Sequence, residues 1–149
     1  MIVSIYRKGS HNPGRNTQNM QEVTNALRRR YGDRLFVFQG PMHLNHSLHI
    51  FGRTRLMLGV HGGAMYNLHF APQETVVVEY IGTAKDGSIP SDVAHTIIWR
   101  LAQNAGQTYY RVAETPLNSQ LDINIDIATL VKLLDRIDRV QLGEKSSPV

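Results

Sequence analysis

The chain has 149 residues, of which 42% are hydrophobic and 19% charged, and its formal net charge is +4 at pH 7. These values fit a single globular domain and exclude a chain that stays disordered for lack of apolar residues. Cysteine is absent, which excludes disulfides, thiolate zinc sites and a cysteine nucleophile, and no apolar run is long enough for a transmembrane helix.

In the first half of the chain, short apolar runs alternate with amphipathic segments. Asn19 and Glu22 have the spacing of a capping box, which marks the start of a helix. Pro72 follows another helical stretch and is expected to end it. These patterns predict strands over 2–6, 35–38 and 55–60, and helices over 20–31, 44–51 and 64–71.

The second half of the chain continues this alternation. Its clearest strand is predicted over 75–81, and a polar loop follows over 82–91. Asp92 and Asp126 are expected to cap two further helices, and Gly106 is expected to end the first of them.

The order of these elements predicts the fold class. Five apolar runs, the last over 108–112, alternate with helices and are mostly continuous. This favours an α/β fold with a Rossmann-like, open, mostly parallel sheet and helices on both faces. We expect one domain over 1–140 and a flexible polar tail over 141–149. Ligands of such sheets bind beyond the carboxyl ends of the strands, near the switch in strand order.

The most informative segment is the turn at His61, Gly62 and Gly63, between a predicted strand and a predicted helix. Glycines allow a tight turn and a close approach of the backbone to a ligand. The N–H groups of the first helical turn then offer an anion site, to which His61 can add a donor. The alternative is an ordinary strand-to-helix turn in which His61 bonds to the backbone, and the pattern alone does not decide between the two.

Three charged residues are expected at the same edge of the sheet. Arg7 and Lys8 directly follow the first strand, and such a pair can neutralise a diphosphate. Their alternative role is that of ordinary solvent-facing loop residues. Glu79 lies inside an apolar strand, where it could accept hydrogen bonds from a ribose or pair with a nearby Lys or Arg.

Two other readings of the charged residues are weaker. His43, His46 and His49 are three residues apart, and this helical spacing turns the third ring away from the first, so we predict a solvated face and no metal site. The positive charge also suits nucleic acid, but it does not explain the His-Gly-Gly turn, and nucleic acid ranks last among the expected partners.

Several segments together resemble glycosyltransferase family 61. The stretch from Leu58 to Phe70, followed by Thr75-Val-Val-Val-Glu79, is similar to that family's G-V-H-G-A-G-L-T-N and V-V-E pattern. Ile5-Tyr-Arg-Lys-Gly9 resembles its I-S-R-R-G, and Trp99-Arg-Leu-Ala and Tyr109-Tyr110 match its downstream helix and strand. The resemblance spans about residues 1–140. Within the family, the chain is similar to protein O-GlcNAc transferases and xylosyltransferases.

This resemblance implies one half of a GT-B glycosyltransferase, namely the C-terminal half that binds a nucleotide-sugar. The implied reaction is an inverting transfer from a UDP-sugar, such as UDP-N-acetylglucosamine or UDP-xylose, to a hydroxyl of a glycan or protein acceptor. An N-terminal half would bind the acceptor and bring the catalytic base. The UDP-sugar is a co-substrate, and neither a metal nor another cofactor is expected.

The resemblance also implies a role for each site residue. Arg7 and His61 would stabilise the leaving diphosphate, with Lys8 beside them. The amides of Gly62, Gly63 and Ala64 would cradle it. Asn67 would complete the donor site, and Glu79 would hold the ribose.

A non-catalytic α/β module that binds a nucleotide or another phosphorylated ligand is the alternative function. The sequence does not decide the cellular compartment. If the chain is a fragment of a eukaryotic family member, the secretory pathway is expected; otherwise the cytoplasm is expected.

Overall fold

A computed structural model describes residues 1–6, 16–40, 42–84, 86–89 and 93–143 of the chain. Within these residues the strands are Ile2–Ile5 (β1), Leu35–Phe38 (β2), Leu56–Val60 (β3), Val76–Gly82 (β4) and Thr108–Glu114 (β5). The α-helices are Met20–Tyr31 (α1), Leu44–Phe51 (α2), Val93–Asn104 (α3) and Ile127–Ile137 (α4). Shorter helical segments are Gly32–Arg34 (η1), Gly63–Phe70 (η2) and Asp138–Leu142 (η3).

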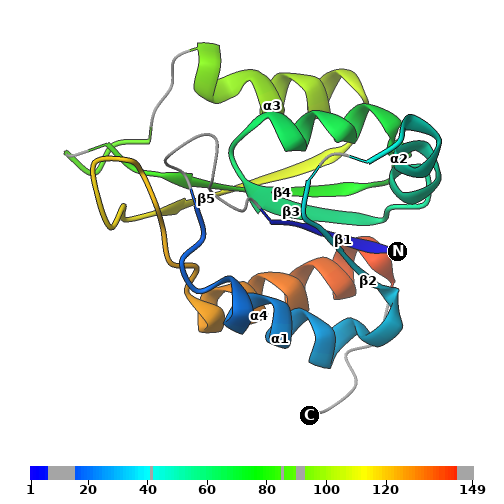
Figure 1. Ribbon diagram of the computed structural model, residues 1–149, viewed down its shortest axis with the longest axis horizontal. Coiled ribbons are helices and arrows are strands. Elements are labelled where there is room, and N and C mark those ends of the chain that lie inside the picture. Colours follow the sequence, from blue (N-terminus) through cyan, green and yellow to red (C-terminus); the bar gives the residue numbers. More distant parts are fainter. Residues whose placement is uncertain (7–15, 41, 85, 90–92, 144–149) are drawn as a thin grey trace.

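The five strands form one parallel sheet in the order β2-β1-β3-β4-β5. The chain passes from β1 to β2 in one direction, then crosses β1 to reach β3, β4 and β5 on the other side. Because such crossovers are right-handed, this reversal places helices on opposite faces of the sheet. Figure 1 shows α1 and α4 on one face and α2 and α3 on the other. The predicted α/β fold is confirmed, and the switch in strand order lies between β1 and β3.

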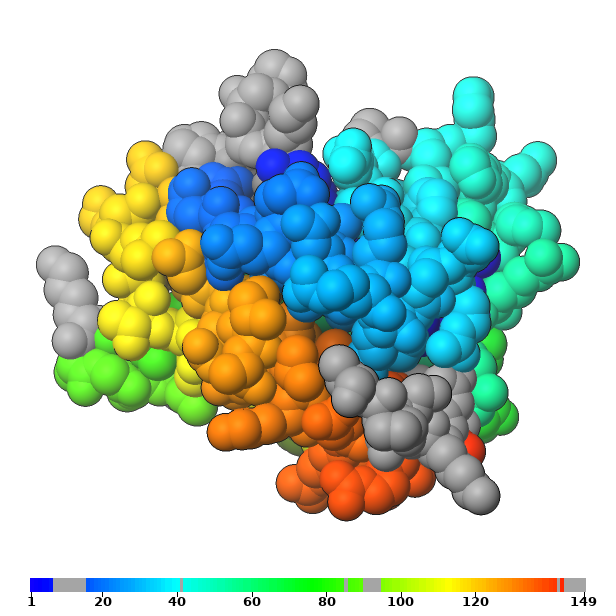
Figure 2. Space-filling model, turned by 90° about the horizontal axis from the view of Figure 1, so that it is seen from below, coloured from blue at the N-terminus to red at the C-terminus, as the bar shows by residue number. Residues whose placement is uncertain are grey.

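Each strand contributes side chains to two separate cores. Leu56 and Leu58 of β3 pack with α1 and α4, whereas Met57 packs with α2, η2 and α3. Figure 2 shows α1 and α4 lying side by side over the first of these faces. Since both faces are covered, all residues of β4 are buried, and apart from Glu79 its sequence is therefore a continuous apolar run rather than an alternating one.

The helix ends confirm some local predictions and overturn one. The Asp126 side chain accepts the Thr129 N–H at 2.7 Å, and Gly106 takes a left-handed φ of +68° after α3. The capping box at Asn19 is wrong, because no side-chain hydrogen bond caps α1 there. The Asn19 amide instead bonds the backbone of Ile125, on a segment distant in sequence, at 2.9 and 3.0 Å. Asp92 lies outside the described residues.

The C-terminal part of the chain stays helical beyond α4. The segment η3 runs through Leu142 and ends at Gly143, whose φ is +63°. Residues 141 and 142, predicted to lie in the polar tail, therefore belong to η3, and residues 144–149 lie outside the described part. Within the described ranges, no helix combines the length and the apolar character needed to cross a bilayer.

Gly59 lets β1, β3 and η2 approach closely beside the switch point. A Cβ atom at this position would lie 2.8 Å from the Ile5 Cβ and 3.3 Å from the Ile5 carbonyl oxygen. We expect Gly59→Ala to lower the free energy of unfolding by about 1–3 kcal/mol, because backbone atoms must move to accept the methyl group. Urea denaturation measures this loss. Gly63→Ala is the control, since a Cβ there meets nothing within 4 Å, and equal stabilities for the two variants would contradict the prediction.

Candidate functional site

The turn that follows β3 leads directly into η2. The helix predicted over 64–71 is confirmed in position, but it is a 3-10 helix over Gly63–Phe70. Its buried side chains explain the tighter winding: Met65 and Leu68 are three residues apart and both fully buried, and this spacing places them on one side of a helix with three residues per turn.

Three successive backbone amides are left open at this turn. The His61 N–H donates to the Tyr80 carbonyl at 2.8 Å, and the Met65 N–H donates to the Gly62 carbonyl at 2.9 Å. Between them, the N–H groups of Gly62, Gly63 and Ala64 have no acceptor among the described residues. Amides at a helix start attract anions, because their dipoles point the same way.

Asn67 supports this turn from within η2. Its side-chain Nδ2 donates to the Ala64 carbonyl at 2.9 Å, which ties the side chain back to the first turn of the helix. Beside Gly63, the position of a Cβ atom is open space within 4 Å. A ligand can therefore approach this backbone without meeting a side chain.

His61 and Glu79 form a buried pair below the turn. Glu79 lies opposite Gly59 of β3 in the register of the sheet, so its side chain points to the face covered by α2 and α3. The His61 Nδ1 lies 2.5 Å from the Glu79 Oε1. An ionised carboxylate only accepts hydrogen bonds, and Nδ1 is therefore the donor.

Tyr109 and Arg111 of β5 hold the other oxygen of Glu79. The Tyr109 hydroxyl donates to Oε2, and the Arg111 Nε lies 3.6 Å from the same oxygen. The Arg111 Nε also donates to the Tyr109 hydroxyl at 3.0 Å. Burial, together with the hydrogen bond to Glu79, raises the pKa of Tyr109, so the phenol keeps its proton and remains a donor. The Arg111 guanidinium compensates the buried carboxylate charge.

The surroundings of Glu79 fit one of its two predicted roles, that of a carboxylate paired with a nearby Lys or Arg. Its exposed fraction is 0%, and both oxygens are engaged within the protein by His61 and Tyr109. Arg111 supplies the cationic partner that a charge inside an apolar strand requires. No oxygen of Glu79 faces solvent in this structure, so a direct hydrogen bond to a ribose has no accessible acceptor here.

The ring of His61 is held on its flank as well. It stacks on the ring of His95 from α3, with the ring centroids 5.3 Å apart and an interplanar angle of 29°. His61 is 5% exposed, and none of the described residues bonds its second ring nitrogen, Nε2. This nitrogen is thus the atom of His61 that is available to a ligand.

The structure brings together the predicted residues that follow β3, and it adds others. His61, Gly62, Gly63, Ala64 and Asn67 lie at one turn, whereas Arg7 and Lys8 lie outside the described residues. Sequence reasoning missed Tyr109, Arg111 and His95. Part of this arrangement could have been predicted from the sequence, because a glutamate within an apolar run needs partners. Tyr109 and Arg111 are two residues apart on the following strand, and this spacing places them on one face of the sheet.

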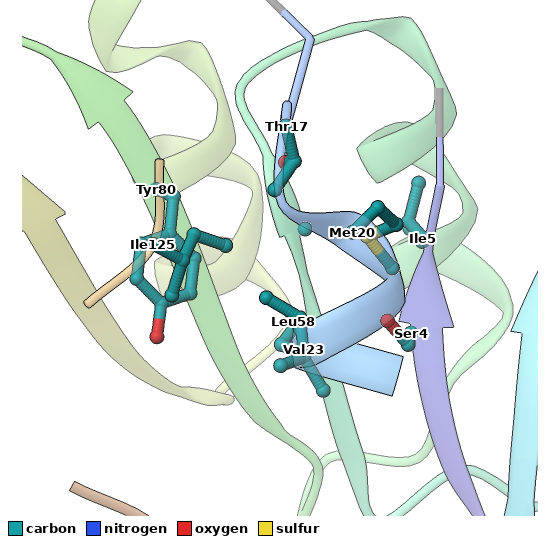
Figure 3. Close-up of a pocket in the computed structure, with 9 residues that line it drawn as sticks. Ser4, Ile5, Thr17, Met20, Val23, Leu58, Tyr80 and Ile125 are labelled. Atoms are coloured by element: carbon teal, nitrogen blue, oxygen red, sulfur yellow. The ribbon is translucent and has the colours of Figure 1, made fainter. Parts of the chain in front are cut away.

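The structure has a small hollow at the switch point and a larger, open hollow beside Tyr109 and Arg111. The first, of about 10 Å³, lies between β1, β3 and α1 at the switch point, lined by residues such as Ser4, Thr17 and Leu58. Figure 3 shows these side chains and Tyr80 around it. It has room for about one water molecule, so a nucleotide cannot occupy it. The second is an open hollow of about 370 Å³ between α3 and β5, lined by Thr96, Trp99, Tyr109 and Arg111.

The three histidines at and within α2 are exposed, as predicted for a solvated face. His43, His46 and His49 all face solvent, and His49 lies 3.2 Å from an Arg53 nitrogen. No group of three potential metal-ligating side chains comes together in the part of the chain that the structure describes.

Comparison with known proteins gives one family and one fold. The family model described as Glycosyltransferase 61 matches residues 2–78. Among solved structures, a diflavin flavoprotein A3 from Nostoc sp. is similar at 11% identity, with a TM-score of 0.50, over 95% of this chain and 97% of that chain. At this identity the likeness concerns the fold alone. The comparison with curated proteins gives no match.

Proposed function

Because this chain belongs to glycosyltransferase family 61, we propose that it binds the donor, a UDP-sugar, of an inverting glycosyltransferase and corresponds to one half of a GT-B enzyme. In this proposal the sugar passes to a hydroxyl of a glycan or protein acceptor. Another domain binds the acceptor and supplies the catalytic base.

The observation that carries this proposal is the open turn after β3. The amides of Gly62, Gly63 and Ala64 have no acceptor among the described residues, and none of those residues bonds the Nε2 of His61, which directly precedes them in the chain. The turn lies next to the switch point between β1 and β3, where ligands of open parallel sheets bind. A diphosphate matches this set of donors in charge and in hydrogen bonding.

Each site residue then has a role in the departure of the diphosphate. The three amides cradle its oxygens, and Asn67 holds their backbone in place through the bond to Ala64. His61, when protonated at Nε2 as well, donates to the leaving group and offsets its developing charge. Arg7 and Lys8, which follow β1 in the sequence, are proposed to neutralise the remaining charge. No metal is part of the proposal.

UDP titration by isothermal calorimetry tests the site. We expect saturable binding to the wild type, and a loss of affinity of about tenfold or more in His61→Ala, since an ionic hydrogen bond is worth about 1.5–3 kcal/mol. Gly63→Ala should keep its stability but bind UDP more weakly, because a methyl group would enter the space at the turn. His69→Ala is a matched control, because His69 is exposed at the far end of η2.

The possible results of these measurements separate the readings. Wild-type affinity in both His61→Ala and Gly63→Ala would refute the site. UDP binding without release of UDP from any UDP-sugar, even with acceptor and partner domain supplied, would favour a non-catalytic nucleotide-binding module.

A further inference from the structure

The carboxylate of Glu79 has two oxygens with separate partners, and only one of them faces His61. Oε1 accepts from the His61 Nδ1, while Oε2 accepts from the Tyr109 hydroxyl. A carboxylate held by one oxygen alone can turn about its last bond, whereas one held by both cannot. The orientation of the acceptor offered to His61 therefore depends on Tyr109, a residue of β5 whose hydroxyl bonds Glu79 and not the His61 ring.

Arg111 connects this arrangement to the other flank of His61. One of its terminal nitrogens donates to the His95 carbonyl at 2.6 Å, and its Nε donates to the Tyr109 hydroxyl. The same guanidinium thus fixes the backbone of α3, whose His95 ring stacks on His61. The His61 ring is held between Glu79 and His95, and Arg111 contacts the supports on both sides.

The position of Arg111 shows that its role at Glu79 is more than that of an ion-pair partner. Its Nε lies 3.0 Å from the Tyr109 hydroxyl but 3.6 Å from the Glu79 Oε2. The hydroxyl is therefore the direct donor to Oε2, and Arg111 orients that hydroxyl. An ion pair alone would bring the fork of the guanidinium onto the carboxylate.

We propose that Tyr109 and Arg111 are positioning residues that act through Glu79 and His95 to keep the His61 ring in a single state, with its proton on Nδ1 and Nε2 toward the ligand. The chemical reason is that neutral imidazole carries one proton, and a carboxylate fixed at Nδ1 keeps it there. Nε2 is then the basic nitrogen of the ring. That it takes up a proton and donates to a diphosphate rests on the proposed function. The family match ends at residue 78, so it assigns no role to either residue.

Tyr109→Phe tests the inference, because it removes the hydroxyl and keeps the ring. Tyr110→Phe is the matched control: Tyr110 is the next residue of β5 and packs against the opposite core. Long-range ¹H–¹⁵N spectra report the tautomer of each histidine ring, and His61→Gln identifies the His61 signals. We expect the Nδ1-protonated form in the wild type and in Tyr110→Phe, and a mixture of tautomers in Tyr109→Phe.

Arg111→Lys is the second variant. It keeps the charge but lacks the planar fork that reaches both the Tyr109 hydroxyl and the His95 carbonyl, so the His61 signals should shift in the same direction. In both variants UDP affinity should fall about three- to tenfold, the effect of one net hydrogen bond, while the thermal midpoint of Tyr109→Phe stays near that of Tyr110→Phe.

The His61 ring signals and the affinity for UDP test different claims. Unchanged His61 ring signals in Tyr109→Phe overturn the positioning role, whatever the affinity for UDP. A wild type that does not bind UDP overturns the proposed function instead, because the ring measurement requires no ligand. A wild-type His61 protonated on Nε2 alone also overturns the inference.

Discussion

Glu79→Ala is expected to lower the free energy of unfolding by about 3–5 kcal/mol, the cost of breaking a buried ion pair from one side. The substitution removes the acceptor of both His61 and Tyr109 and the contact of Glu79 with the Arg111 guanidinium. Donors that stay buried without an acceptor are expensive, since they have lost their water as well. Urea denaturation followed by circular dichroism gives the free energy directly.

Glu74→Ala is the matched control for this measurement. Glu74 precedes the same strand but is exposed, and its loss should change stability by less than about 0.5 kcal/mol. Glu79→Gln should fall between the two, because the amide keeps the shape of the side chain and part of its hydrogen bonding. A loss below about 1 kcal/mol in Glu79→Ala would mean that the site is open enough for water to replace the carboxylate.

Asp122→Ala is expected to cost about 2–4 kcal/mol at pH 7, because one buried carboxylate gathers several donors. Asp122 is 4% exposed, and it accepts from the backbone and side chain of Asn16 and from the side chains of Gln18 and Asn118. Figure 2 shows the segment before Asp122 lying against the segment that leads into α1. Its loss frees both segments at once.

The stability contributed by Asp122 should also depend on pH in a defined direction. Hydrogen bonds, first that from Asn118 and then that from the Asn16 amide, lower the pKa of Asp122 below its ordinary value. A depressed carboxyl pKa stabilises the fold above the unfolded value of about 3.9, and this gain is lost as the pH falls through the lower folded value. The difference between wild type and Asp122→Ala should therefore be full at neutral pH and shrink below about pH 4.

Asp33→Ala serves as the control, because Asp33 is exposed and its effect should be small at every pH. A wild-type advantage that stays constant down to about pH 2 would show that Asp122 acts by packing and not through its charge.

The fold was predictable because its signals are local. Continuous apolar runs mark strands that are covered on both faces, as in β4, and Asp126 and Gly106 mark helix ends through contacts within a few residues. The Asn19 prediction failed for the opposite reason. Its amide found partners on Ile125, more than a hundred residues away, and such competition leaves no trace in a local pattern.

The candidate site was predictable in part. A Gly-Gly turn after an apolar strand indicates where a ligand can approach the backbone, and the turn lies where the strand order predicts it. The pairing of Glu79 with His61 and with Tyr109 was not predictable, because it depends on the register among β3, β4 and β5. A shift of one residue in that register would send Glu79 to the opposite core.

The family match ends inside β4, and this has a consequence for shortened proteins. A fragment that stops there would keep the recognisable motif but lose β5, and with it the hydrogen bonds along one side of β4. The remaining valines of β4 would then form an unprotected edge strand. Such a strand pairs readily with the same strand of other molecules. Such fragments should aggregate when expressed, whereas fragments extending through α4 should remain monodisperse.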